Sequence, residues 1–124
     1  MPRLDTLKVL LVDDHDDGRE ILALYLEYEG ASVAQARTGS EALELAGGER
    51  PDVVVSNVHM PGLDGLAFLR ALRDTPTLAG VPAFALSGDL RLERSGRIAD
   101  AGYVGFFPKP IDPEIVVREL AHLL

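Results

Sequence analysis

Short apolar runs alternate along the chain with stretches whose apolar residues recur at helical spacing. The apolar runs indicate buried strands over residues 7–12, 32–37, 52–56, 81–86 and 103–107. The stretches between and after them predict helices over 16–29, 38–46, 64–73 and 91–101, and from 112 to the C-terminus. This alternation predicts an α/β fold, in which βαβ crossovers build a parallel sheet with helices on both faces.

The helical spacing also predicts which side chains face the core. We expect buried stripes on the first, third and last helices, made by Ile21, Leu24, Tyr25 and Tyr28, by Leu66, Leu69 and Leu72, and by Val116, Leu120 and Leu123. The segment 91–101 is a poor helix because Gly96 stands in its middle, where glycine costs about 1 kcal/mol relative to alanine. We expect this segment to be the most mobile part of the fold.

Composition and charge narrow the class of protein. With 124 residues, of which 47% are hydrophobic, the chain suits a single domain over 1–124 with a real core. No apolar run approaches the roughly 18–20 residues of a membrane span, and no signal peptide is expected. A net charge of −8 argues against nucleic-acid or anionic-membrane partners, and the absence of cysteine fits a cytoplasmic protein.

Polar side chains stand at the ends of four of the predicted strands. The first strand ends in Asp13 and Asp14, the third in Asn57 and the fourth in Ser87, while Lys109 follows the fifth. The carboxyl ends of parallel strands meet at one edge, where ligands bind in such folds. Paired carboxylates are suited to Mg²⁺, and a lysine with a hydroxyl is suited to phosphoryl oxygens. The sequence therefore predicts a site for a divalent cation and a phosphoryl group.

Four sequence motifs resemble one known family. LLVDDHDDGRE, PDVVVSNVHMPGLDG, FALSGD and AGYVGFFPKPID occur in the order and spacing of response-regulator receiver domains of bacterial two-component signalling, over nearly the whole chain. The resemblance implies a flavodoxin-like, doubly wound (βα)5 fold with strand order 2-1-3-4-5. It also implies that a histidine kinase passes a phosphoryl group to an aspartate at the end of the third strand.

The resemblance also assigns roles to residues of this chain. It implies a Mg²⁺ pocket formed by Asp13, by Asp14 as the direct ligand, and by the backbone carbonyl of His59. The phosphoryl-binding and switch positions would be Ser87, Lys109, which precedes an often cis proline, and Phe106. Partners would be a histidine kinase or phosphotransfer protein, or a downstream effector, bound through the 91–124 face.

The sequence departs from the family at the phosphoacceptor itself, where Asn57 replaces the aspartate. A carboxamide is neutral and cannot form an acyl phosphate. Its carbonyl oxygen could still serve as a weak metal ligand, but one negative charge is missing from the pocket. We therefore expect Mg²⁺ binding to be weakened or lost.

Two functions follow from these residues. The first is a receiver without enzymatic activity that signals by protein–protein interaction, either a natural pseudo-receiver or an engineered phospho-dead form. The alternative is a small Mg²⁺-dependent phosphatase or phosphotransferase of haloacid-dehalogenase type. In that case Asp14-His15-Asp16 would be its D-x-D motif, with Asp14 as nucleophile and with Ser87 and Lys109 as the second and third motifs. No acidic pair follows Lys109, and the chain has no room for a cap domain.

Four further side chains, of two histidines, a serine and an aspartate, lie near the predicted site. His15 and His59, together with Asp14, could form an adventitious transition-metal site. Ser56 should point away from the pocket because side chains alternate along a strand. Asp89 could control the access of water or could be an ordinary loop acid.

Overall fold

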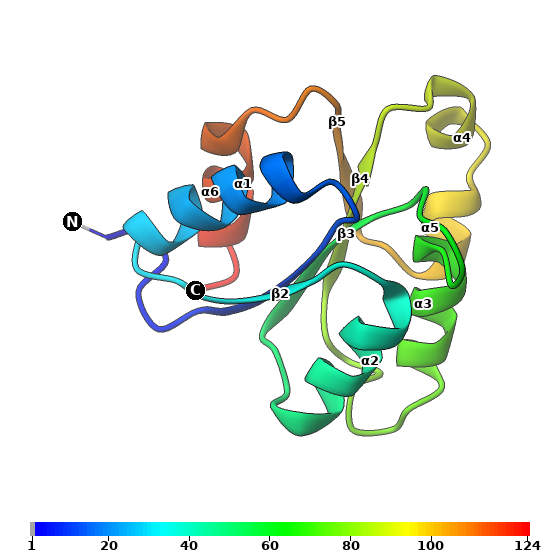
Figure 1. Ribbon diagram of the computed structural model, residues 1–124, viewed down its shortest axis with the longest axis horizontal. Coiled ribbons are helices and arrows are strands. Elements are labelled where there is room, and N and C mark those ends of the chain that lie inside the picture. The colour runs from blue at the N-terminus through cyan, green and yellow to red at the C-terminus, as the bar shows by residue number, and fades with distance from the viewer. Residues whose placement is uncertain (1) are drawn as a thin grey trace.

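Five parallel strands form one sheet in the order β2-β1-β3-β4-β5, as predicted (Figure 1). The computed structural model describes residues 2–124. The strands are β1 (Lys8–Val12), β2 (Ser32–Ala36), β3 (Val53–Asn57), β4 (Ala83–Ser87) and β5 (Gly105–Pro108). β3 and β4 are buried along their whole length, whereas most of β2, at the edge, is exposed.

Residues 2–124 form six helices, most of which cover the two faces of the sheet (Figure 1). They are α1 (Asp16–Tyr28), α2 (Gly39–Gly48), α3 (Gly65–Arg73), α4 (Leu90–Arg94), α5 (Arg97–Ala101) and α6 (Pro113–Ala121). α1 and α6 lie against one face, and α2, α3 and α5 lie against the other. Among these helices of residues 2–124, none is long and apolar enough to cross a membrane.

Each face of the sheet has its own core. Val53 and Val55 of β3 pack toward α1 and α6, while Val54 packs toward the helices of the opposite face. This alternation follows from the two-residue period of a strand. The predicted stripe of α3 is confirmed, since Leu66, Leu69 and Leu72 are buried.

The predicted buried face of α1 is wrong. The residues expected inside are exposed, with relative accessibilities of 61% for Ile21, 68% for Leu24, 40% for Tyr25 and 86% for Tyr28. Leu22, Ala23, Leu26 and Arg19 are buried instead. The helix carries two apolar faces, and periodicity alone cannot rank them.

The orientation of α1 is fixed by Arg19, whose guanidinium reaches the edge of the sheet. Its Nη1 donates to the backbone oxygen of Asp13 at 2.9 Å, and its Nε donates to the Gln35 side chain at 3.0 Å. Arg19 shares a face with Leu22 and Leu26, three and seven residues later. These bonds therefore turn that face toward the sheet and leave the Ile21 face in solvent.

Two predictions near the C-terminus also need correction. Leu123 is 40% exposed because α6 ends at Ala121, so Val117 completes the buried stripe with Val116 and Leu120. The single poor helix predicted over 91–101 is two short helices. Gly96 separates them with a φ of 81°, a left-handed conformation that glycine adopts readily.

Candidate functional site

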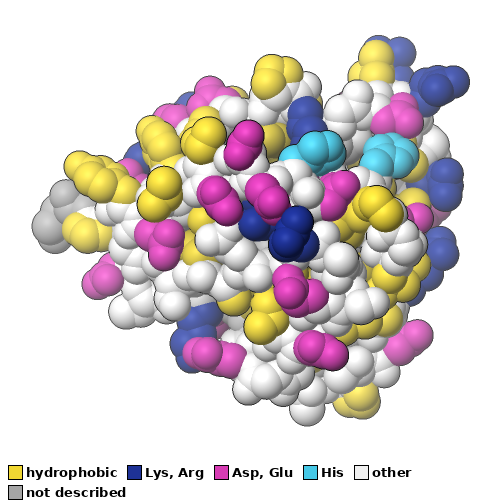
Figure 2. All heavy atoms as spheres, viewed as in Figure 1, with side chains coloured by type: hydrophobic (Ala, Val, Ile, Leu, Met, Phe, Trp, Pro, Cys, Tyr) yellow, Lys and Arg dark blue, Asp and Glu magenta, His cyan; other side chains and the backbone are white. Residues whose placement is uncertain are grey.

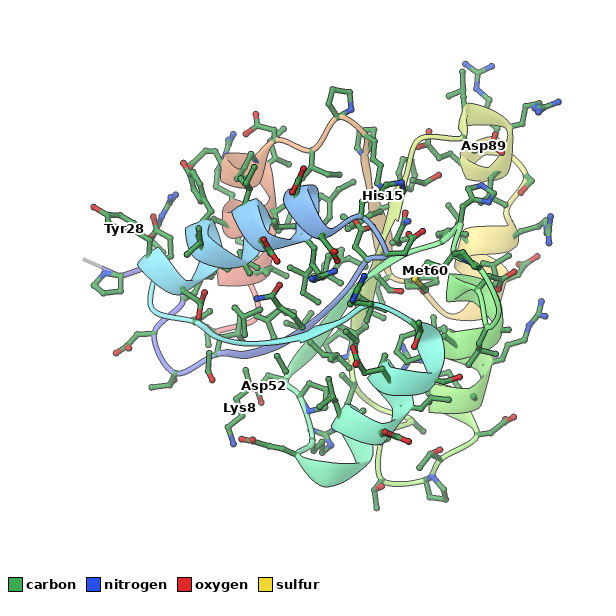
Figure 3. The ribbon with its side chains drawn as sticks, in the orientation of Figure 1. Lys8, His15, Tyr28, Asp52, Met60 and Asp89 are labelled. Atoms are coloured by element: carbon green, nitrogen blue, oxygen red, sulfur yellow. The ribbon has the colours of Figure 1, made fainter. Side chains whose placement is uncertain are left out.

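The predicted site residues come together at the carboxyl edge of the sheet. Asn57 and Ser87 are the last residues of β3 and β4, and Asp13 directly follows β1. In the sheet, β1 lies between β2 and β3, and β4 is the next strand. Figure 3 shows the labelled His15 at the start of α1, facing the loops that carry Met60 and Asp89. In Figure 2, histidine and acidic side chains gather over the same edge.

The side chain of Asn57 lies at the centre of this group and is 3% exposed. Its Nδ2 donates to the His59 backbone oxygen at 2.8 Å, to Asp14 Oδ1 at 3.1 Å and to Asp13 Oδ1 at 3.4 Å. All three partners are acceptors, so the amide nitrogen must face them rather than the amide oxygen. One carboxamide therefore connects the ends of β1 and β3.

Asp13 is the most buried acid of the site, at 5% exposure. Its Oδ1 accepts from the backbone nitrogen of His15 at 3.0 Å, and its Oδ2 lies 3.6 Å from Lys109 Nζ. A buried carboxylate needs such partners because losing its hydration is costly. The partners balance the charge of Asp13 within the protein itself.

Ser87 and Lys109 lie on neighbouring segments, as the sequence predicted. Ser87 is 1% exposed, and its Oγ accepts from the backbone nitrogen of Asp89 at 3.2 Å. The backbone nitrogen of Lys109 donates to the Ser87 oxygen at 2.9 Å, and the Lys109–Pro110 peptide bond is cis. A hydroxyl and an ammonium therefore border the Asn57 cluster on the β4–β5 side.

Phe106 lies apart from this cluster. It is 42% exposed on β5, while the next residue, Phe107, is buried and stacks on Phe84 with ring centroids 5.3 Å apart. Consecutive side chains of a strand face opposite sides, which places Phe106 on the surface.

The two histidines of the proposed transition-metal site are separated. The Nδ1 atom of His15 lies 3.2 Å from Asp13 Oδ1 and 3.4 Å from Asp14 Oδ1. The ring of His59 turns instead toward Asp89, with Nε2 3.5 Å from Oδ2. The expected group of Asp14, His15 and His59 therefore does not form through the two rings.

Asp89 and Ser56 have structural roles. Asp89 Oδ1 accepts from the backbone nitrogens of Arg91 and Leu92 at the start of α4, and the bond from Leu92 lowers the pKa of the Asp89 carboxyl. Ser56 is fully buried and donates to the Asn57 backbone oxygen at 3.0 Å. Neither residue donates to the Asp13–Asp14 cluster.

Sequence reasoning missed Arg19, a buried arginine that holds the backbone of the site in place. Its Nη1 bond to the Asp13 oxygen fixes the strand end from which Asp13 and Asp14 extend. A signal was present, because Arg19 lies on the helical face of Leu22 and Leu26. An arginine on a buried apolar face needs a polar partner, and strand-end carbonyls are such partners.

The residues present do not fit the Mg²⁺ that the resemblance implies. Asp13 Oδ1, Asp14 Oδ1 and the His59 oxygen all accept hydrogen bonds from Asn57 Nδ2. The sequence led us to expect the carbonyl oxygen of Asn57 as a weak ligand, but the nitrogen faces the pocket. A cation and a hydrogen-bond donor cannot occupy the same position.

The D-x-D motif required by a phosphatase of haloacid-dehalogenase type does not assemble either. Asp16 Oδ1 lies 2.8 Å from Arg19 Nη1 and 3.1 Å from Arg37 Nε. The hydrogen bond from Arg19 lowers the pKa of the Asp16 carboxyl. Asp16 is thus engaged with two arginines, and no hydrogen bond joins it to Asn57 or Lys109 in residues 2–124.

The chain is similar to known signalling proteins. Residues 9–121 match the family of the response regulator receiver domain. The chain is 40% identical over 120 residues to the response regulator MprA of Mycolicibacterium vanbaalenii. This alignment covers 95% of this chain and 50% of MprA. It is 36% identical to an uncharacterised 14.6 kDa protein of Leptolyngbya boryana over 95% of this chain and 90% of the relative. The chain therefore spans half the length of MprA but most of the smaller relative.

Solved structures give the same result. The chemotaxis response regulator CheY4 of Vibrio cholerae superposes with a TM-score of 0.89 at 32% identity, covering 96% of this chain and 99% of that one. The receiver domain of Ssk1 from Saccharomyces cerevisiae, crystallised with the histidine phosphotransfer protein Ypd1, has a TM-score of 0.87. At 18% identity, covering 97% of this chain and 90% of the other, this second likeness concerns the fold alone. On the match over residues 9–121 and these relatives, the chain belongs to the response-regulator receiver family.

Proposed function

We propose that this receiver acts in a two-component system through protein–protein interaction and takes no phosphoryl group at position 57, the phosphoacceptor position. The observation that carries the proposal is the place of Asn57. It ends β3 with its amide 3.1 Å from Asp14 Oδ1, and Ser87 ends the adjacent strand. The nitrogen lone pair of a carboxamide is delocalised, so Asn57 cannot attack phosphorus to form an acyl phosphate.

The proposal makes the chain a binding module and not an enzyme. A serine nucleophile would need an adjacent base to activate it. The Oγ of Ser87 accepts a backbone hydrogen bond, and the Oγ of Ser56 donates to a backbone oxygen. Neither hydroxyl therefore has the activation that covalent catalysis requires.

The partner would be a histidine kinase, a histidine phosphotransfer protein or a downstream effector, bound through the 91–124 face. The complex of the Ssk1 receiver with Ypd1 illustrates one such partner for a protein of the same fold. Leu90, at the border of this face, and Val104 are more than half exposed, and Phe106 is 42% exposed. Exposed apolar side chains of this size suit a protein interface.

The charge of this region indicates the chemistry of the partner. Arg91, Arg94 and Arg97 are exposed and form none of the ion pairs found within residues 2–124. Figure 2 shows Lys and Arg side chains along the side of the molecule that α4 and α5 occupy. Residues 91–124 carry five basic and five acidic side chains in a chain of net charge −8, so this face repels an acidic partner less than the rest of the chain does. The cytoplasmic location that the proposal assumes agrees with the absence of cysteine.

Phosphoryl uptake tests the assignment of Asn57. The unmodified chain and Asn57→Asp are incubated with acetyl phosphate and Mg²⁺, and their intact masses are measured. We expect one phosphoryl group on Asn57→Asp and none on the unmodified chain. Uptake by the unmodified chain would refute the proposal and direct attention to Ser56 or the aspartates. Uptake by neither form would contradict the view that position 57 alone disables the site.

A further inference from the structure

We propose that the side-chain amide of Asn57 takes the place of the receiver's Mg²⁺ and holds the metal-ligand oxygens together without a metal. The inference rests on the proposed assignment of Asn57 to the phosphoacceptor position, and it concerns the metal pocket of that site. It goes further than the loss of one negative charge, because the amide nitrogen itself holds the oxygens of the pocket in place.

The geometry supports this role. The three groups that would bind the cation are Asp13, Asp14 and the His59 carbonyl, and these are the three acceptors of Asn57 Nδ2. The donor–acceptor distances are 2.8 Å to His59, 3.1 Å to Asp14 and 3.4 Å to Asp13. An amide nitrogen has two N–H groups with partial positive charge, which can lie between negative oxygens as a cation would. The contact to Asp13 is shielded, since Asn57 is 3% exposed and Asp13 is 5% exposed, while the contacts to Asp14 and His59 are partly buried.

Other groups of the chain offset one of the two negative charges of the pocket, and the second acid, Asp14, keeps a side chain that is 27% exposed. Lys109 Nζ lies 3.6 Å from Asp13 Oδ2, and the His15 backbone nitrogen donates to Asp13 Oδ1 at 3.0 Å. No buried side-chain nitrogen or oxygen in residues 2–124 lacks a hydrogen-bond partner. The two carboxylates can therefore stay close together without a dication.

A cation could enter only by displacing the amide. Rotating the carboxamide to present its oxygen would break all three hydrogen bonds and direct the two N–H groups elsewhere in a buried site. This cost weakens metal binding in addition to the effect of the missing charge, and the two effects on metal affinity can be separated. Asn57→Ala carries the same charge as the unmodified chain but has no amide to displace.

Binding of Mn²⁺ to three forms of the full chain tests the inference. Mn²⁺ prefers the same oxygen ligands as Mg²⁺, and its free concentration can be followed by electron paramagnetic resonance. We expect Asn57→Ala to bind Mn²⁺ about tenfold more tightly than the unmodified chain. This is the size of change in metal affinity that one residue beside a metal site typically causes. Asn57→Asp should bind most tightly. Equal affinities of the unmodified chain and Asn57→Ala would overturn the inference, because charge alone would then explain the loss.

A second measurement keeps the inference testable if Asn57→Ala does not fold. The side-chain NH₂ signals of Asn57 in the ¹⁵N-labelled, unmodified chain should not move when millimolar Mg²⁺ is added, and the thermal midpoint should be the same in Mg²⁺ and in EDTA. A shift of these signals, or a midpoint raised by Mg²⁺, would overturn the inference. The midpoint of Asn57→Asp should rise with Mg²⁺.

The outcome can be separated from that of the proposed function. If the unmodified chain binds Mn²⁺ as tightly as Asn57→Ala but takes up no phosphoryl group, the amide does not replace the cation and the proposed function stands. If the unmodified chain takes up a phosphoryl group, the proposed function fails whatever the metal affinity.

Discussion

The hydroxyl of Tyr103 donates a 2.7 Å hydrogen bond to the carbonyl oxygen of Gly65, and both groups are buried. The bond joins the segment after α5 to the first residue of α3. Burial raises the pKa of the Tyr103 hydroxyl well above its ordinary value, so the group remains a donor at all physiological pH values. It therefore secures the segment that leads into β5 against the helix beside the site.

Removing this hydroxyl should reduce stability while preserving the fold. In Tyr103→Phe the ring still fills its place, so the loss is that of one buried hydrogen bond, about 0.5–1.5 kcal/mol in the free energy of unfolding. Urea unfolding measures the change. Tyr28→Phe is the matched control, because Tyr28 is 86% exposed and should show no change. Equal stabilities of all three forms would show that the Tyr103 bond contributes nothing.

The two apolar faces of α1 can be compared by one substitution at two positions. Leu26 is fully buried, and Leu24, two residues earlier, is 68% exposed. Leu26→Ala should cost about 2–5 kcal/mol in the free energy of unfolding, since it leaves a cavity. Leu24→Ala should change it by less than about 0.5 kcal/mol. Thermal and urea unfolding measure both variants. If Leu24→Ala lowered the free energy of unfolding more than Leu26→Ala, the orientation of α1 in the structure would be refuted.

The strand ends were predictable from the sequence, while the rotation of α1 was not. Apolar runs that stop at Asp13, Asn57 and Ser87 mark strand ends directly, and parallel topology brings such ends to one edge. The two faces of α1 are both apolar, so the choice between them depends on Arg19 and its tertiary bonds to Asp13 and Gln35. Local periodicity contains no information about such bonds.

The orientation of the Asn57 amide was also beyond sequence reasoning. The sequence identified the residue and its loss of charge, but not which amide atom meets the acids. That choice depends on the His59 carbonyl turning toward the pocket, where it accepts at 2.8 Å. The resemblance implied the His59 carbonyl as a metal ligand, but only the folded loop after β3 shows that this carbonyl accepts a hydrogen bond from Asn57 Nδ2.

Two glycines that both lie in helices should respond in opposite ways to alanine. A Cβ on Gly65 would lie only 2.7 Å from Val58 Cα and still closer to the Asn57 backbone oxygen, whereas a Cβ on Gly47 would meet nothing within 4 Å. Gly65→Ala must therefore push α3 away from the end of β3. It should lower the free energy of unfolding by about 1–3 kcal/mol, in the range of overpacked cores.

Gly47→Ala is the control and should be stabilising. Alanine in a compatible helical position restricts the unfolded chain and adds about 0.4–1 kcal/mol to the free energy of unfolding. Urea unfolding of the two variants measures both effects. If Gly65→Ala were tolerated as well as Gly47→Ala, the close approach of α3 to the end of β3 would be refuted.

The stability of the chain in acid should depend on Arg3, which bridges two glutamates. Its Nη1 lies 2.6 Å from Glu114 Oε1, and its Nη2 lies 3.1 Å from Glu29 Oε2. These hydrogen bonds lower the pKa of both carboxyls below the ordinary value of 4.5. Because the folded state binds these protons less readily than the unfolded state, the bridge stabilises the fold above the unfolded pKa. That stabilisation is lost as the pH falls through the folded pKa values.

Arg3→Ala should therefore unfold at a higher pH than the unmodified chain in an acid titration followed by circular dichroism. The difference in stability between the two proteins should be full near neutral pH and should shrink below about pH 4. Arg50→Ala is a control for net charge, because the Arg50 guanidinium donates to the Thr77 backbone oxygen and forms no ion pair within residues 2–124. A shared shift of both variants would trace the effect to the lost positive charge. A shift in Arg3→Ala alone would trace it to the bridge, since the hydrogen bonds from Arg3 are the main cause of the lowered pKa of Glu29 and Glu114.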